Sequence, residues 1–167
     1  MSVHKIDGGP GGENNHFPKK FITLYSSDTS ITAGDFVMID PTDTTNGLGG
    51  SVRQAQSGFN TDVHEGLCIG VATETITAAG EIQIQIAGKY ENANVATTVI
   101  CGQNLVMSGT AGRAQDATQL ACQTNADALE RNIIAVALES EGAATGTEPN
   151  SGVTNQVDVL IKNQGYF

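Results

Sequence analysis

The stretch Glu81–Tyr90, EIQIQIAGKY, decides the fold of this chain, because its first half alternates strictly between apolar and polar side chains. The apolar positions are Ile82, Ile84 and Ile86, and the polar positions between them are Gln83 and Gln85. Successive side chains of a β-strand point to opposite faces, so a period of two predicts a strand with one face in a core.

Similar stretches lie on both sides of this one, separated by turn residues. The predicted strands are Phe21–Tyr25, Ile31–Ile39, Ser51–Gln56 and Leu67–Ile76. Asp40-Pro41 ends the second of them, and a polar, Gly-rich loop spans 41–65. Good helix formers gather only at Asn125–Arg131. The sequence therefore predicts an all-β fold, a small β-barrel or β-sandwich with at most one or two short helical turns.

The second half of the chain repeats the pattern of the first, which predicts two similar halves, 21–90 and 95–167. The matched segments are Ile31–Ile39 with Val99–Met107, Cys68–Glu74 with Ile133–Glu139, and Ile82, Ile84 and Ile86 with Val157, Val159 and Ile161. An internal duplication explains such a match. The alternative is coincidence in a chain rich in small and β-branched residues.

The charge of the chain is strongly acidic, with a formal net charge of −10. Binding to nucleic acid relies on Lys and Arg against phosphate, so this charge argues against a nucleic-acid partner and against an anionic membrane. No run approaches 18 apolar residues, and no apolar signal core is present. We expect synthesis in a cytosol. We expect Cys68, Cys101 and Cys122, an odd set without CxxC spacing, to be buried free thiols.

The first twenty residues differ from the rest, because they are Gly-rich, low in apolar content and mildly basic. Chain of this composition does not bury enough surface to order itself, so 1–20 is predicted to be a flexible arm and 21–167 the β-rich barrel domain. The arm and its base carry the candidate binding residues His4, Lys5, His16, Phe17, Lys19, Lys20 and Phe21. The alternative is a tail without a binding role.

Catalytic motifs are missing from the sequence. His64-Glu65 precedes Cys68, but a zinc-protease motif needs a second His in that last position, on a helix. Gly8–Gly12 lacks the Lys-Ser/Thr of a phosphate-binding loop, and no G-x-S-x-G occurs. We therefore predict no catalytic residue, no metal and no cofactor, and a protein that is not an enzyme.

Three motifs together resemble the capsid-decoration (cement) proteins of tailed bacteriophages. They are Ala33–Val37 (AGDFV), Gly66–Ala72 (GLCIGVA) and Glu81–Gly88 (EIQIQIAG), with a second copy in Gly102–Met107, Ala135–Glu139 and Val157–Ile161. The likeness covers about residues 21–167 and rests on loose apolar patterns. The chain departs from the shorter members in its arm, in its loop at 41–65 and in an insertion at 142–155.

The resemblance implies a structural virion protein on the outer surface of an icosahedral phage head. It implies binding to the major capsid protein and self-association as a homotrimer, with no catalytic residues. Two other functions stay open from the residues: a carbohydrate- or host-surface-binding head-fibre module, and a domain of a larger complex or enzyme. The low aromatic content counts against the first of these, since sugar sites use aromatic platforms.

Overall fold

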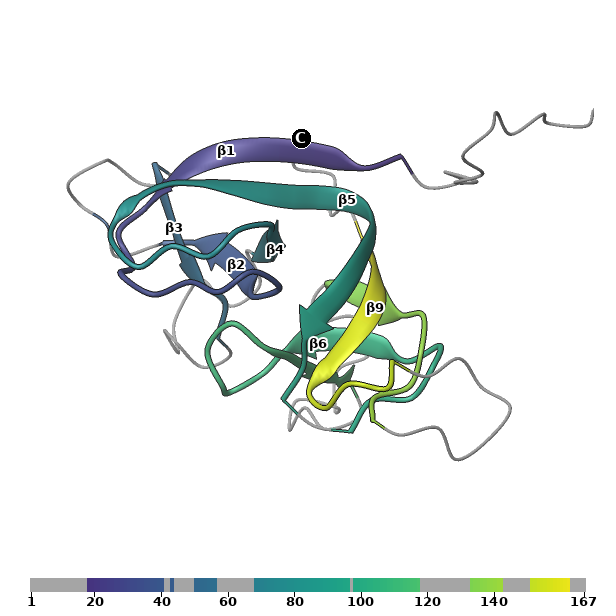
Figure 1. Ribbon diagram of the computed structural model, residues 1–167. Coiled ribbons are helices and arrows are strands. Elements are labelled where there is room, and N and C mark those ends of the chain that lie inside the picture. Colours follow the sequence, from purple (N-terminus) through teal and green to yellow (C-terminus); the bar gives the residue numbers. More distant parts are fainter. Residues whose placement is uncertain are drawn as a thin grey trace, which may run out of the picture.

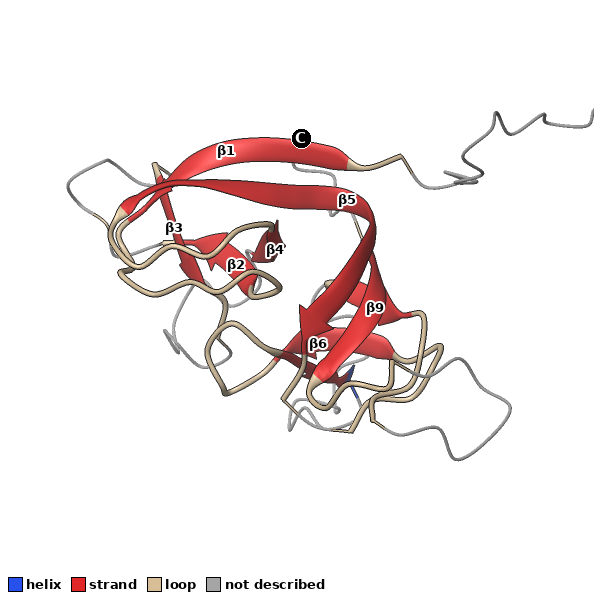
Figure 2. Ribbon diagram, in the orientation of Figure 1, coloured by secondary structure: helices blue, strands red, loops and turns tan. Residues whose placement is uncertain are grey.

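The computed structural model describes residues 18–40, 43, 50–56, 68–96, 98–117, 133–142 and 151–162, and these ranges hold nine β-strands and no α-helix (Figures 1 and 2). The strands are β1 (Lys20–Ser26), β2 (Phe36–Ile39), β3 (Ser51–Gln54), β4 (Cys68–Ala72), β5 (Gly80–Asn94), β6 (Asn104–Met107), β7 (Ala114–Asp116), β8 (Ala135–Ala137) and β9 (Gln156–Ile161). The all-β prediction is confirmed. The predicted helical stretch at 125–131 lies outside the described residues.

The first five strands form a closed barrel in the order β1-β3-β2-β4-β5, which β1 closes by pairing antiparallel with β5. Apolar side chains fill the interior, and they include Ile82, Ile84 and Ile86 as the alternation predicts. In Figure 1 β1 runs beside the first part of β5 along the top of the molecule. Burying one such side chain contributes roughly 1.5–3 kcal/mol, so this face fixes the register of the strand.

The second predicted strand is shorter than the sequence suggested. A turn separates Ile31 from β2, because the N–H of Asp35 donates to the carbonyl oxygen of Thr32 at 3.0 Å. Gly34 in this turn has a φ of +94°, a conformation that glycine adopts without steric cost. The strand therefore begins at Phe36, while Ile31 forms only an isolated bridge.

The remaining strands form a second unit that shares β5 with the first. Beyond a bend, Gly88–Asn94 of β5 pairs antiparallel with β9, and the order continues β9-β8-β6-β7. Val95, directly after β5, forms a parallel bridge to Ala114 in β7. This bridge corresponds to the parallel pairing of β1 with β3 in the first barrel. Figure 1 shows β9 beside the lower part of β5.

Equivalent hydrogen bonds recur in the two units. The N–H of Gly34 donates to Ala72 at 2.9 Å, and the N–H of Gly102 donates to Ala137 at 2.8 Å. In each unit a glutamate carboxylate accepts a hydrogen bond from a backbone N–H of that unit's last strand. Glu74 accepts from the N–H of Gln83 in β5 at 2.9 Å, and Glu139 accepts from the N–H of Asp158 in β9 at 2.8 Å. The segments matched in the sequence thus occupy matching places in the two units. Their origin by duplication stays a prediction.

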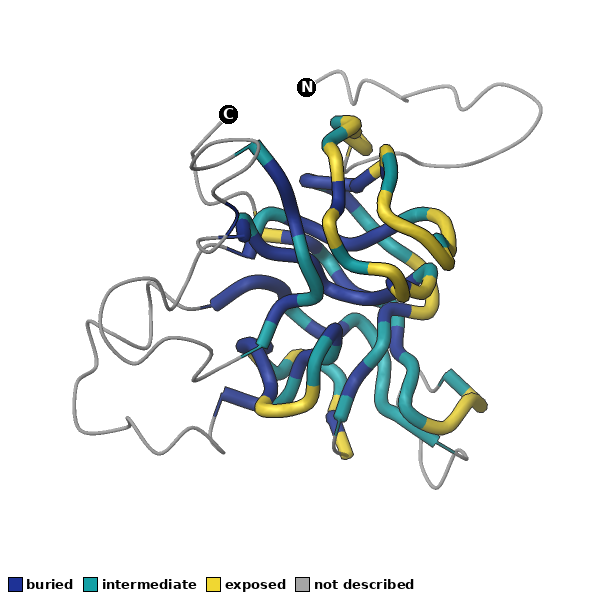
Figure 3. The backbone as a smooth tube through the Cα atoms, turned by 90° about the vertical axis from the view of Figure 1, so that its left-hand side faces the viewer, coloured by how far each residue is buried: buried dark blue, intermediate teal, exposed yellow. Residues whose placement is uncertain are grey.

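The main core lies between the two units. β2 and β4 turn some side chains into the first barrel and others, such as Phe36, Met38 and Val71, toward the second unit. Both faces of these strands are buried, which is why they read as continuous apolar runs rather than alternating ones. Figure 3 shows the buried stretches running through the middle of the molecule and the exposed stretches at its rim.

Candidate binding surface

The outer face of β1 is the most apolar exposed surface that a described strand presents. Phe21 is 47 % exposed and Tyr25 is 40 % exposed, with the exposed Thr23 between them. The alternate residues Ile22 and Leu24 are half-buried and pack against the core of the first barrel. The strand therefore holds its aromatic rings outward because its aliphatic side chains are anchored inside.

The neighbouring strand adds polar groups to this face. In the register of β1 with β5, Gln83 lies opposite Thr23 and Glu81 lies opposite Tyr25, and both β5 side chains are exposed. Lys19 and Lys20, both exposed, lie at the start of β1. The surface thus has a basic end and an acidic end about one strand length apart.

The other edge of β1 is open over most of its length among the described residues. β3 pairs with β1 only at Tyr25 and Ser26. The carbonyl oxygen of Gln83 accepts the N–H of Thr73 at 3.0 Å, so the backbone of Gln83 points away from β1. In an antiparallel ladder the backbone groups of two directly opposed residues either both face the seam between the strands or both face away from it. The backbone N–H and C=O of Thr23, and by the same alternation of Phe21, therefore face the open edge.

The predicted binding residues fall into two groups. Lys19, Lys20 and Phe21 lie together at the exposed start of β1, and Lys20 pairs with Ala87, so the strand begins at the last residue of the predicted arm. His4, Lys5, His16 and Phe17 lie outside the described residues. Tyr25 and Glu81 were not among the predicted binding residues, although the predicted strand Phe21–Tyr25 already implies that Phe21 and Tyr25 share one face.

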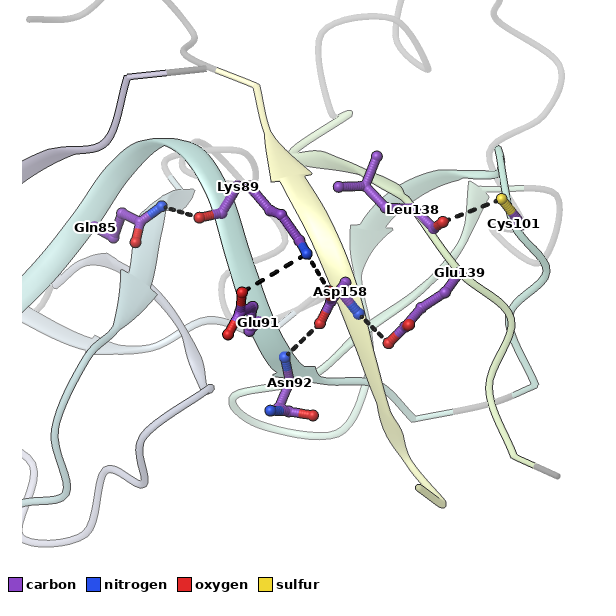
Figure 4. Close-up of polar contacts among 8 residues, drawn as sticks. All are labelled: Gln85, Lys89, Glu91, Asn92, Cys101, Leu138, Glu139 and Asp158. Carbon is purple, nitrogen blue, oxygen red and sulfur yellow. Dashed lines mark hydrogen bonds and ion pairs between the residues drawn. The ribbon is translucent and has the colours of Figure 1, made fainter. Parts of the chain in front are cut away.

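A second polar cluster lies where β5 meets β9, and its role is structural. The ammonium of Lys89 lies 2.6 Å from Oδ2 of Asp158, whose Oδ1 accepts the N–H of Asn92 at 3.2 Å (Figure 4). The hydrogen bond that the Lys89 ammonium donates to the Asp158 carboxylate raises the pKa of Lys89 above its usual value. Asn92 has a φ of 61°, and the register of β5 on β9 shifts beside it. The cluster therefore holds a β-bulge in place.

Gln85 shows why β5 bends next to this cluster. Its side chain lies on the face opposite the isoleucines, yet it is only 2 % exposed. The amide nitrogen donates to the carbonyl oxygens of Ala87 at 3.1 Å and Lys89 at 2.9 Å. These carbonyls belong to the segment where β5 stops pairing with β4 and begins to pair with β9. The side-chain amide therefore supplies hydrogen bonds to backbone groups at the bend.

The described thiols and acidic groups do not form a reactive cluster. Burial raises the pKa of Cys68 to about 12, so this thiol is protonated at neutral pH. The thiol of Cys101 is half-buried and lies 3.2 Å from the carbonyl oxygen of Leu138. Cys122 and His64 lie outside the described residues. In the described ranges no three His, Cys, Asp or Glu side chains gather as a metal site would require.

Comparison with known proteins does not assign a family. Models of known protein families give no match to this chain, and no curated protein matches it. Among the described residues no helix is long and apolar enough to cross a membrane. The function must therefore be argued from the residues themselves.

Proposed function

We propose that this chain is a structural virion protein that binds the outer surface of an icosahedral phage head and stabilises the coat lattice. The observation that carries the proposal is the exposed start of β1, where Lys19, Lys20 and Phe21 lie beside one another on an otherwise acidic protein. The sequence motifs that resemble capsid-decoration proteins support the same function. The partner is the major capsid protein, the location is the virion, and the protein associates with itself as a homotrimer.

The mechanism is mass-action linkage rather than chemistry. A protein that binds the assembled lattice but not free coat subunits shifts the equilibrium toward the lattice. Each contact can be weak, because many copies act on one particle. A basic and aromatic contact of this kind suits an acidic or apolar coat surface, where Phe21 supplies buried area and the lysines supply complementary charge.

The experiment measures retention on purified heads of the phage that encodes the chain. Removal of residues 1–19 leaves β1 whole, and we expect it to lower occupancy at least about tenfold, the effect of losing roughly 1.4 kcal/mol. Replacement of Lys19 and Lys20 by Glu tests the charge contribution, and Lys162→Glu is the matched control, since Lys162 is exposed after β9. Occupancy equal to that of the unaltered chain in the first two variants would contradict the role of this surface. Failure of the unaltered chain to bind heads would contradict the function.

A second candidate function is a carbohydrate- or host-surface-binding head-fibre module. The pair of exposed rings, Phe21 and Tyr25, favours it, because aromatic faces on one strand form platforms for sugar rings. Binding of the isolated chain to a glycan array, lost in Tyr25→Ala and retained in Lys162→Glu, would support this function over capsid decoration.

A further inference from the structure

A pair of hydrogen-bonded side chains recurs in the two units with its acid and its amide exchanged. In the first barrel the amide of Gln54, the last residue of β3, donates to Oδ2 of Asp35 at 2.7 Å. In the second unit the amide of Gln103 donates to Oδ2 of Asp116, the last residue of β7, at 3.0 Å. Asp35 and Gln103 directly precede β2 and β6, and β2 pairs with β3 as β6 pairs with β7. The two pairs therefore occupy matching places.

Asp35 and Gln103 also make the same contacts within their turns. The N–H of Asp35 donates to the carbonyl oxygen of Thr32 at 3.0 Å, and its Oδ2 accepts the N–H of Thr32 at 2.9 Å. The N–H of Gln103 donates to the carbonyl oxygen of Ile100 at 3.1 Å, and its Oε1 accepts the N–H of Ile100 at 2.8 Å. Each side chain thus holds its own turn closed and binds the neighbouring strand as well.

The carboxylate of Asp35 has a further contact that crosses between the units. Its Oδ1 accepts the side-chain amide of Asn94, the last residue of β5, at 2.8 Å. The side-chain oxygen of Asn94 in turn accepts the amide of Gln156, the first residue of β9, at 3.0 Å. We call the side chains of Gln54, Asp35, Asn94 and Gln156 the polar junction. They form one chain of hydrogen bonds from the first barrel to the last strand of the second unit.

The chemistry of the two side chains explains why only an acid suits this junction. A carboxylate has two acceptor oxygens, whereas an amide has one oxygen and one donor nitrogen. In Gln103 the oxygen already accepts from Ile100 and the nitrogen donates to Asp116. A glutamine in the place of Asp35 would use its two ends in the same way, so it would have no second oxygen to offer to Asn94.

We infer that the carboxylate of Asp35 holds the bend of β5 closed by fixing the end of that strand at Asn94 against the first barrel. The counterpart pair in the second unit has the exchanged arrangement and holds only its own turn. This inference goes beyond the proposed function, because it concerns how the two units are joined and does not depend on any partner.

The first experiment tests in the second unit whether the two pairs are equivalent. Gln103→Asp alone brings two carboxylates together, and Asp116→Gln alone brings two amides together. Each single variant should lower the Tm by about 2–6 °C. The double variant reproduces the pair of the first barrel, so it should lower the Tm by clearly less than the sum of the single effects. Additive losses overturn the equivalence.

The second experiment tests the junction by the same exchange in the first barrel. Asp35→Gln with Gln54→Asp keeps the pair but removes the oxygen that accepts from Asn94. The loss in Tm is measured in the unaltered chain and in Asn94→Ala, where the junction is already broken. We expect the loss to be about 3–12 °C smaller in Asn94→Ala, the effect of one hydrogen bond to a charged group. Losses that agree within about 2 °C in the two backgrounds overturn the inference.

Hydrogen exchange of Asn94→Ala reads the bend directly, even if the exchanged first barrel does not fold. The N–H of Phe36 donates across the junction to Gly112 at 2.8 Å, whereas the N–H of Thr73 donates to Gln83 within the first barrel at 3.0 Å. We expect exchange at Phe36 to be at least about tenfold faster than in the unaltered chain, and exchange at Thr73 to stay within about threefold.

Asn104→Ala is the matched control, since Asn104 is an exposed asparagine at the start of β6, and it should leave both exchange rates unchanged. No acceleration at Phe36 in Asn94→Ala overturns the inference. Equal acceleration at Phe36 and Thr73 overturns it too, because Asn94 would then contribute to the stability of the whole chain and not to the bend of β5.

Discussion

Gly112 provides the sharpest test of the packing between the two units. It lies in the turn between β6 and β7 with a φ of +74°, and a Cβ atom built on it would lie 2.6 Å from Cγ of Asp35. The Asp35 carboxylate is itself fixed. It accepts hydrogen bonds from the N–H of Thr32 at 2.9 Å, from the amide of Gln54 at 2.7 Å and from the amide of Asn94 at 2.8 Å. A methyl group at Gly112 therefore forces a buried, three-fold hydrogen-bonded carboxylate to move.

The cost of Gly112→Ala has two parts that a control variant separates. An L side chain at positive φ costs about 1–2 kcal/mol. Displacing Asp35, which is 5 % exposed, breaks at least one hydrogen bond to a charged group and adds about 1.5–3 kcal/mol. Gly102 has a φ of +86° and open space where its Cβ would be, so Gly102→Ala carries only the first part. We expect Gly112→Ala to lower the free energy of unfolding by about 2.5–5 kcal/mol and Gly102→Ala by about 1–2 kcal/mol.

Urea unfolding measures both values, followed by circular dichroism because the chain has no Trp. The double variant Asp35→Ala with Gly112→Ala removes the carboxylate that the methyl group strikes, so its cost should be clearly less than the sum of the two single costs. Costs for Gly112→Ala and Gly102→Ala that agree within about 0.5 kcal/mol would refute the reasoning, since the carboxylate would then move freely.

Three further predictions concern named side chains. The raised pKa of Cys68 means that its contribution to stability is complete below its ordinary pKa of 9.0 and is lost as pH rises toward about 12; at pH 10 this amounts to about 1.4 kcal/mol. Urea unfolding at pH 7.5 and 10 should show the loss in the unaltered chain and a smaller one in Cys68→Val. Gln85→Ala removes the two hydrogen bonds to the partly buried carbonyls of Ala87 and Lys89 and should cost about 1–3 kcal/mol, whereas the exposed Gln83→Ala should cost less than about 0.5 kcal/mol; equal costs would contradict the role of Gln85 at the bend. Glu74→Ala and Glu139→Ala should each cost about 0.5–1.5 kcal/mol in thermal or urea unfolding, because each carboxylate accepts the N–H of its unit's last strand; a cost confined to one of them would count against the equivalence of the units.

The candidate surface could be predicted only in part. The sequence identified Lys19, Lys20 and Phe21 because they lie at the end of a Gly-rich, mildly basic segment whose composition differs from that of the rest of the chain. Glu81 was missed because it is far from them in sequence, and only the antiparallel register of β1 on β5 puts it on the same face. The open part of the edge of β1 could not be predicted from the sequence either. Whether the backbone of Thr23 is paired depends on how far β3 extends along β1, and no local pattern encodes that length.

The sequence by itself determined the class of the fold and most of its strands. Alternation at Ile82, Ile84 and Ile86 fixed β5 and its buried face, because only one register puts three isoleucines into a core. The duplication that the matched segments of the two halves predict stays a prediction.

Only the tertiary structure decided how the halves are joined. β5 is one strand in the sequence but belongs to both units. Its bend depends on the hydrogen bond of Gln85 to Lys89 within β5 and on the ion pair of Lys89 with Asp158 of β9. Packing between the units buries both faces of β2, so both faces of this strand carry apolar side chains. Among the described strands the same arrangement pairs one edge of β1 with β3 only at Tyr25 and Ser26, because pairing depends on distant strands, whereas alternation depends on adjacent residues.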